Sequence, residues 1–326
     1  MRALFIVAVA TGCNETDLVG NVLPDVVPAP YDPAPPERED VIIQVTSPIV
    51  DTLYVIDNSC SMEDEQAKLA DNFPTFIDFF VQSGLDYHVG VVTTDTDNPA
   101  DSGKLKMGNG ALWIDNQTED PIGAFDKMAK QGIDGSGLER GLDAAYLALF
   151  EEIDQFNEGF VREHATLHVV MITDELDQSN IITRDEFADL LLDFKAEPGM
   201  VTFSSIVWPE GVGTGPLGES AGTDYMFVTE HVGGIIFDIR EDDWSPVMEE
   251  LGIQAAGLKR EFFLTQLPVV DTIEVSVVDA GARQVFATTD YIYDGLRNSI
   301  TFVEYIPNPL AEIHIKYTLL TSEAQD

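Results

Sequence analysis

The sequence predicts an α/β protein with a doubly wound, mostly parallel sheet, followed by a small antiparallel β-sandwich. Short apolar runs alternate with amphipathic segments as far as Gly257, which is typical of parallel strands covered by helices on both faces. Beyond Gly257, apolar residues recur at every second position, as they do in antiparallel strands with one buried face. A chain of 326 residues, 44% of them hydrophobic, is also long enough to form about two domains.

The strands and helices of the first domain are expected in alternation. The apolar run at 53–56 predicts a strand that is buried on both faces. The helix after it carries a large apolar residue at spacings of four, three and four, which places them on one face. These residues are Leu69, Phe73, Phe76 and Phe80. Further strands are expected at 88–92, 167–172, 201–207 and 234–239, and further helices at 138–149, 184–195 and 242–258.

The last part of the chain, 258–326, is expected to form the sandwich. Apolar side chains alternate along 273–277 and 313–317, and turns rich in Gly and Pro lie between these segments. The change of period therefore places the domain boundary at 257, with the α/β domain over 41–257.

The N-terminal segment 1–13 resembles a bacterial lipoprotein signal. Arg2 gives a positive start, an apolar stretch follows, and small residues precede Cys13, which would become the lipidated N-terminus of the mature protein. An ordinary apolar N-terminus with a chance cysteine is the alternative. Residues 14–40 are acidic and rich in Pro, and they are predicted to form an extended tether. We therefore expect a lipid-anchored protein of the bacterial cell envelope, at the outer membrane or the cell surface.

The charge of the chain excludes two classes of function. It has 17 basic and 58 acidic residues, for a formal net charge of −41. Nucleic-acid binding requires a cationic face, which this composition does not supply. Adsorption to an anionic membrane surface is excluded for the same reason, so membrane contact is expected only through the lipid. Two cysteines are too few for a disulfide-rich scaffold.

Oxygen-bearing side chains follow two of the predicted strands. Asp57, Ser59 and Ser61 come directly after the strand at 53–56. Asp174 follows a later strand, and Ser136 opens a helix between them. Because ligands bind beyond the carboxyl ends of parallel strands, we expect these side chains to lie together. Mg²⁺ prefers such oxygens and binds through one or two carboxylates, so a divalent-cation site is predicted whose ion can also accept a carboxylate from a partner.

These residues resemble the metal-ion-dependent adhesion site of the von Willebrand factor type A domain family. The segment 57–61 matches the family's D-x-S-x-S motif, and Asp174 matches the Asp of its second acidic loop. Counting back from Gly141 places Ser136 where the family usually has a Thr ligand. The resemblance implies a bound Mg²⁺, with Mn²⁺ or Ca²⁺ as alternatives.

Most of the chain after the tether is also similar to a group of bacterial envelope lipoproteins that contain such a domain. The similar segments are 51–62, 135–142, 173–175, 233–234 and the ending from 262 to 317. A cysteine that the resemblance implies near 237–240 is absent, which argues against a disulfide there but not against the metal site.

Two further motifs are expected to be surface loops. The Gly218-x-Ser220-x-Gly222 pattern of a hydrolase nucleophile needs a strand before it and a helix after it, and a Gly-rich stretch precedes it here. The acidic stretch at 95–101 lacks the Gly and distal Glu of an EF-hand loop. We therefore expect no enzymatic activity.

The expected function is metal-dependent binding or adhesion, in which the cation coordinates an acidic group of a partner protein or glycan. The alternative is a structural component of an extracellular assembly, such as an envelope, appendage or virion, in which the metal fixes an interface. The sequence does not specify the ligand or the oligomeric state.

Overall fold

The computed structural model describes residues 36–44, 49–196, 199–255, 257–308 and 310–320. The predicted lipidation site Cys13 and the greater part of the predicted tether lie outside these residues. Within the described part of the chain, no helix is both long enough and apolar enough to cross a membrane.

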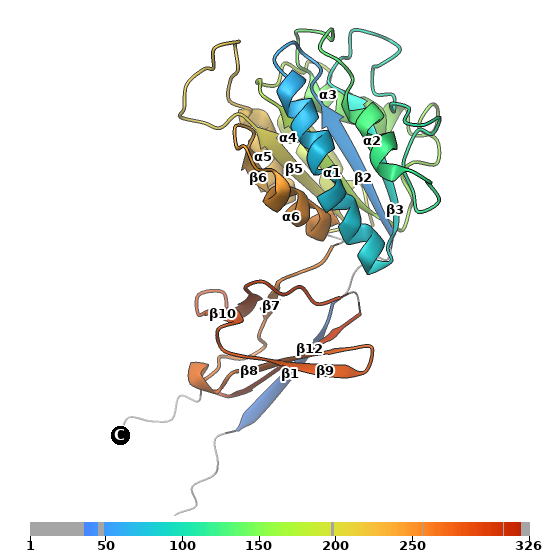
Figure 1. Ribbon diagram of the computed structural model, residues 1–326. Coiled ribbons are helices and arrows are strands. Elements are labelled where there is room, and N and C mark those ends of the chain that lie inside the picture. The colour runs from blue at the N-terminus through green and yellow to red at the C-terminus, as the bar shows by residue number, and fades with distance from the viewer. Residues whose placement is uncertain (1–35, 45–48, 197–198, 256, 309, 321–326) are drawn as a thin grey trace, which may run out of the picture. The chain divides into compact units, whose positions relative to one another are not determined.

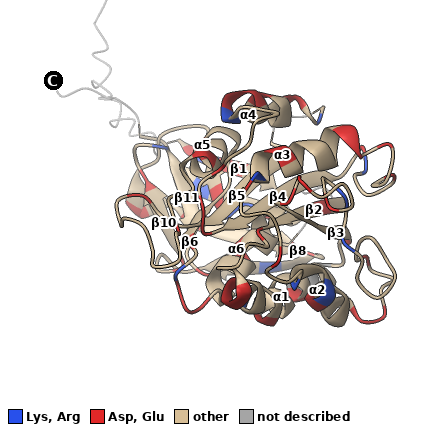
Figure 2. Cartoon of the chain, turned by 90° about the horizontal axis from the view of Figure 1, so that it is seen from above, with Lys and Arg blue, Asp and Glu red and all other residues tan. Residues whose placement is uncertain are grey.

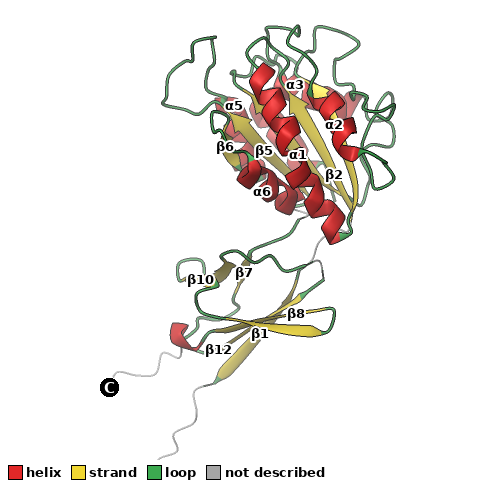
Figure 3. Cartoon of the chain, viewed as in Figure 1, coloured by secondary structure: helices red, strands yellow, loops and turns green. Residues whose placement is uncertain are grey.

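A five-stranded parallel sheet forms the centre of the α/β domain (Figures 1 and 3). Its strand order is β3-β2-β4-β5-β6, and every neighbouring pair is parallel. The predicted mostly parallel sheet is therefore confirmed. Every residue of β4 is buried, because helices cover both faces of the sheet. The strands are β2 (Ile49–Ile56), β3 (Asp86–Thr93), β4 (Thr166–Thr173), β5 (Val201–Val207) and β6 (Ile236–Asp238).

Helices α1, α2 and α6 cover one face of this sheet and α3, α4 and α5 the other, as Figure 2 shows from above. On one face α1, α2 and α6 contribute to a single apolar core, in which Phe73 stacks on Phe125 with ring centroids 3.6 Å apart. On the other face α3, α4 and α5 contribute to a second core. The helices are α1 (Glu63–Ser83), α2 (Pro121–Ala129), α3 (Gly141–Tyr146) with the π-helical turn η1 (Leu147–Glu151), α4 (Arg184–Asp193), α5 (Thr223–Val232) and α6 (Ser245–Ala255).

Three helices differ from the sequence-based expectation. The helix expected at 138–149 begins only at Gly141, so Leu138 precedes it and is 43% exposed instead of facing the core. The short helices α2 and α5 were not expected, because nine and ten residues carry little periodic signal. The start of α2 is nevertheless marked by Pro121 at its first turn and by the Asp120 side chain, which accepts a hydrogen bond from the Gly123 amide.

The C-terminal part forms two antiparallel sheets around one apolar core, as the period of two predicted. One sheet has the order β1-β12-β8-β9 and the other β10-β11-β7. The strands are β1 (Glu37–Ile43), β7 (Glu261–Phe263), β8 (Glu274–Asp279), β9 (Ala282–Phe286), β10 (Tyr291–Asp294), β11 (Ser299–Phe302) and β12 (Glu312–Thr318), and a 3₁₀ turn, η2 (Val270–Thr272), precedes β8.

Strand β1 corrects the expected end of the tether and the expected start of the α/β domain. Its seven residues pair antiparallel with β12, so both 37–40 and 41–43 belong to a C-terminal sheet. Asp40 fixes this strand: its buried carboxylate accepts hydrogen bonds from the Thr265 and Tyr317 hydroxyls at 2.6 and 2.7 Å. Burial alone would raise the pKa of Asp40, but these hydrogen bonds outweigh it and lower the pKa.

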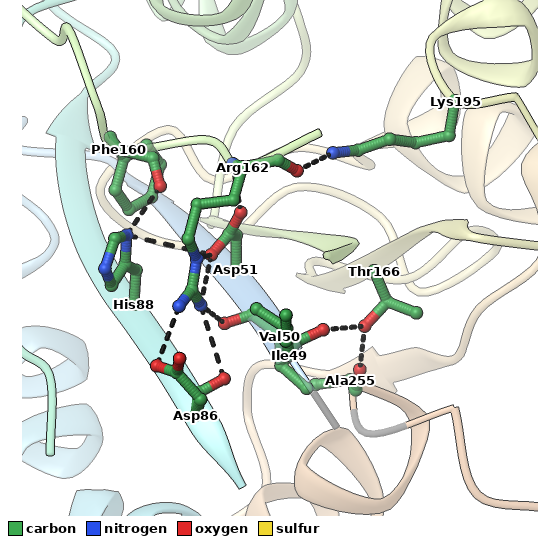
Figure 4. A network of polar contacts seen from close by, with 10 residues as sticks. All are labelled: Ile49, Val50, Asp51, Asp86, His88, Phe160, Arg162, Thr166, Lys195 and Ala255. Carbon is green, nitrogen blue, oxygen red and sulfur yellow. Dashed lines mark hydrogen bonds and ion pairs between the residues drawn. The ribbon is translucent and has the colours of Figure 1, made fainter. Parts of the chain in front are cut away.

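A polar network joins the amino-terminal ends of β2 and β3 to the segment before β4 (Figure 4). The Arg162 backbone amide and Nε donate to the two carboxylate oxygens of the fully buried Asp51, at 2.6 and 2.8 Å. The same guanidinium donates to the Asp86 carboxylate at 2.7 Å and to the Val50 carbonyl at 2.9 Å. Lys195 in turn donates to the Arg162 carbonyl. One arginine thus connects three segments at the end of the sheet opposite to the carboxyl ends of the strands.

Candidate metal site at the carboxyl edge of the sheet

The candidate site lies where β2 and β4 end side by side. Ile56 of β2 is in register with Ile172 of β4, and the Asp57 amide donates to the Ile172 carbonyl at 2.9 Å. Strands β2 and β4 both end here, so Asp57 and Asp174 follow adjacent parallel strands at the same edge of the sheet. This edge is the loop-rich end of the domain, at the arrowhead of β2 in Figure 1.

Asp57 is held rigidly and is completely buried. One carboxylate oxygen accepts the Ser59 amide at 2.7 Å, and the other accepts the Thr173 hydroxyl at 2.6 Å. Burial raises the pKa of Asp57, although both hydrogen bonds act to lower it. Its two hydrogen bonds join the segments that follow β2 and end β4. The Asp57 carboxylate has no cationic partner among the described residues.

The two serines connect Asp57 to Asp174. Their hydroxyl oxygens lie 3.1 Å apart, and Ser61 donates to an oxygen of the Asp174 carboxylate at 3.1 Å. Burial, and next the charge of Asp57, raise the pKa of Asp174 to about 7. Four of the five residues predicted as ligands, Asp57, Ser59, Ser61 and Asp174, therefore lie together in one connected group.

Ser136, the fifth predicted ligand, has other partners in the structure. Its hydroxyl donates to the Asp97 carboxylate at 2.8 Å and accepts the Leu138 amide at 3.1 Å. Arg140 also donates to Asp97, at 2.6 Å. No contact joins Ser136 to Asp57 or Asp174 within the described residues, so the segment that opens α3 uses Ser136 to bind the acidic loop at 95–101.

Glu139 is the residue of this segment that reaches the site, and sequence reasoning missed it. Its side chain is fully buried, and one carboxyl oxygen accepts the Thr94 hydroxyl at 2.5 Å. Burial, and next the neighbouring Asp57 carboxylate, raise the pKa of Glu139 to about 9. The sequence feature that could have indicated Glu139 is its position, a charged residue two positions before Gly141, where α3 begins.

The G-x-S-x-G segment supports the same loops. The Ser220 amide donates to the Asp174 carbonyl at 2.9 Å, and the Ser220 hydroxyl accepts the Leu176 amide at 3.1 Å. Asp177 similarly accepts the Tyr225 hydroxyl at 2.9 Å. These contacts give Ser220 and Asp177 a role in positioning the loop that carries Asp174.

The donors at this edge fit a hard cation. Within the described residues, no three His, Cys, Asp or Glu side chains are already grouped as the ligands of one ion. The group instead combines two buried carboxylates with two hydroxyls, all of them oxygen donors of the kind that Mg²⁺, Mn²⁺ and Ca²⁺ bind. The Glu139 Oε1 atom beside it is buried and has no hydrogen-bond partner. A divalent cation would supply the positive charge that these groups lack.

Comparisons with known proteins found distant similarities to solved structures. No protein-family model and no curated protein matches the sequence. Among solved structures, the chain is similar to a von Willebrand factor type A protein from Catenulispora acidiphila, at 12% identity and a TM-score of 0.42, over 90% of this chain and 67% of that one. It is also similar to proximal thread matrix protein 1 from the mussel byssus, at 14% identity and a TM-score of 0.42, over 70% of this chain and 51% of that one. The pilus adhesin SpaC from Lactobacillus rhamnosus GG, in its open conformation, is similar at 11% identity and a TM-score of 0.43, over 90% of this chain and 42% of that one.

Proposed function

We propose that this chain is a metal-dependent binding protein of the bacterial cell envelope. One divalent cation, Mg²⁺ with Mn²⁺ or Ca²⁺ as alternatives, is held by Asp57, Ser59, Ser61 and Asp174 and coordinates an acidic group of a partner protein or glycan. The observation that carries this proposal is the pair of buried carboxylates at adjacent strand ends, linked through Ser59 and Ser61 and without a Lys or Arg partner among the described residues.

The charge of the site explains why a cation is needed for an acidic partner. Two carboxylates neutralise one divalent ion, and the serine hydroxyls complete part of its shell without adding charge. The ion then remains able to attract a further oxygen, whereas the chain itself, at −41, repels an acidic partner. Removal of the ion should therefore abolish binding rather than weaken it slightly.

Calorimetric titration of the full chain with each metal tests the site. Asp57→Ala removes the carboxylate that both strand ends share, so this variant is expected to lose metal binding. Ser136→Ala is the matched control, because its hydroxyl binds Asp97, and it is expected to bind metal as the wild type does. Equal metal uptake by the wild type and Asp57→Ala would show that the site lies elsewhere.

A pull-down from envelope extract, with and without chelator, tests the binding function. Partners that are released by the chelator, and that Asp57→Ala does not capture, support adhesion through the metal. A chelator-resistant assembly supports the alternative, in which the chain is a structural component of an extracellular assembly. Anchoring through Cys13 is a separate part of the proposal: mass spectrometry of the native protein should find lipid on this residue, and an intact Met1 would contradict it.

A further inference from the structure

Glu139 occupies the place at the site for which the sequence predicted a hydroxyl. The Gly135 amide donates to the Asn58 carbonyl at 3.0 Å, which brings the loop before Glu139 against the loop after β2. A Cβ at Gly135 would lie 2.4 Å from the side-chain amide of Asn58, so a larger residue would fit only if the Asn58 side chain moved. On the other side, the Glu139 carbonyl accepts the Gln178 amide at 2.6 Å. The backbone of Glu139 is thus fixed between the loops that carry Asp57 and Asp174.

The Glu139 side chain has an unmet requirement for a positive partner. It is fully buried, and its Oε2 accepts the Thr94 hydroxyl. Its Oε1 is buried and receives no hydrogen bond from a donor group, the side chain lies within hydrogen-bond reach of the Asp57 carboxylate, and Glu175 is a further charged neighbour. A buried carboxyl oxygen without a donor is costly, and two negative neighbours increase that cost. A cation between Glu139 and Asp57 would remove both penalties.

We propose that Glu139 is a third carboxylate ligand of the site, and that it makes the site select Ca²⁺ over Mg²⁺. This inference rests on the metal binding proposed above but not on the acidic nature of the partner group, because three carboxylates around a divalent ion leave a net charge of −1, and such a site favours a neutral oxygen of the partner. Asp57, Asp174 and Glu139 with the two serine hydroxyls offer at least five protein oxygens. Ca²⁺ takes six to eight oxygens in flexible geometry, whereas Mg²⁺ keeps several waters and usually binds through one or two carboxylates.

Ion binding in the proposed site requires the Glu139 carboxyl group to rearrange. The three carboxylates are not yet grouped around one point, because Thr173 and Thr94 each hold one oxygen of Asp57 and of Glu139. In the proposed site Oε1 of Glu139 turns toward the ion, and Oε2 keeps its hydrogen bond with Thr94. The long and variable bonds of Ca²⁺ tolerate such an arrangement better than the octahedral shell of Mg²⁺.

Titration of the full chain with CaCl₂ and with MgCl₂, followed by calorimetry, tests this inference. The wild type is expected to bind Ca²⁺ about tenfold more tightly than Mg²⁺, or better. Glu139→Gln keeps the shape of the side chain but removes its charge, and it is expected to lower the Ca²⁺ affinity about tenfold with a smaller effect on Mg²⁺. Glu175→Gln is the matched control: it removes one charge from the half-buried residue next to Asp174, and the ratio of the two affinities should stay unchanged.

Each outcome has a distinct meaning. An unchanged ratio in Glu139→Gln overturns the inference and leaves Glu139 as a residue that only positions Asp57. A wild type that binds Mg²⁺ more tightly also overturns it, while the proposed metal-dependent function stands. A wild type that binds neither ion overturns both. Thermal unfolding of each variant in chelator establishes that the variants are folded.

Discussion

At the scale of single residues, the ionisation of Asp174 should report on the candidate site. Its folded-state pKa of about 7 lies above its ordinary value of 3.8, because of burial first and the charge of Asp57 second. A raised carboxyl pKa stabilises the fold at low pH, and this contribution is lost as the pH rises from about 4 through about 7. The metal-free protein therefore carries an electrostatic cost at neutral pH, which a bound divalent cation would remove.

Thermal unfolding in chelator should show this cost. We expect the midpoint of the wild type to fall between about pH 5 and about pH 8, and that of Asp174→Asn to fall less, because the variant has no proton to lose at this position. Added Ca²⁺ should restore the wild-type midpoint at the higher pH but not that of the variant. Parallel curves for the two proteins would show that Asp174 does not carry the cost.

The same scale shows what sequence could predict of the site. The grouping of Asp57, Ser59, Ser61 and Asp174 was predictable, because residues that directly follow adjacent parallel strands must lie at one edge of the sheet. The contribution of the segment 136–139 was not predictable, because this loop does not directly follow a strand of the sheet. Which of its side chains turns inward depends on where α3 starts and on the close approach of Gly135 to Asn58, and both are tertiary effects.

At the scale of elements, the strands were predictable because uniform apolar runs in β2 and β4 reflect burial on both faces. The element that sequence reasoning misplaced is β1, whose partner β12 lies at the other end of the chain. The sequence assigns 37–40, which follow many prolines, to the tether and 41–43 to the α/β domain, although all seven residues form this one strand. Pairing over such a separation leaves no local signal.

The position of β2 and β3 at the other end of the sheet depends on Arg162. Arg162→Ala would leave the Asp51 carboxylate buried without its guanidinium, and we expect the free energy of unfolding to fall by about 3 kcal/mol. Arg184→Ala is the control, because Arg184 is 41% exposed and its pair with Asp224 should contribute about 1 kcal/mol or less. Denaturant unfolding of both variants measures the difference. Arg162 lies at the strand ends opposite to the candidate site, so the metal affinity of its variant should not change. Equal losses of unfolding free energy in the two variants would contradict the argument from the buried ion pair.

At the scale of the whole molecule, excess negative charge should make stability depend on salt. Even if each of the 17 basic residues pairs with one of the 58 acidic ones, 41 acidic groups have no cationic partner. Salt screens both the repulsion among acidic groups and the attraction within ion pairs. The repulsion is the larger effect here, because unpaired acidic groups outnumber the ion pairs. Raising NaCl from about 0.05 M to about 1 M is therefore expected to increase the unfolding temperature, by about 2–4 °C for each kcal/mol gained.

The same measurement separates general screening from the specific site. A millimolar concentration of CaCl₂, matched in ionic strength with NaCl, should stabilise the wild type more than NaCl does, because a ligand that binds only the folded state shifts the unfolding equilibrium. Asp57→Ala should keep the response to NaCl and lose the additional response to Ca²⁺. If the variant keeps both responses, the divalent ion acts on the acidic surface as a whole, and the pair of buried carboxylates at the ends of β2 and β4 is not its binding site.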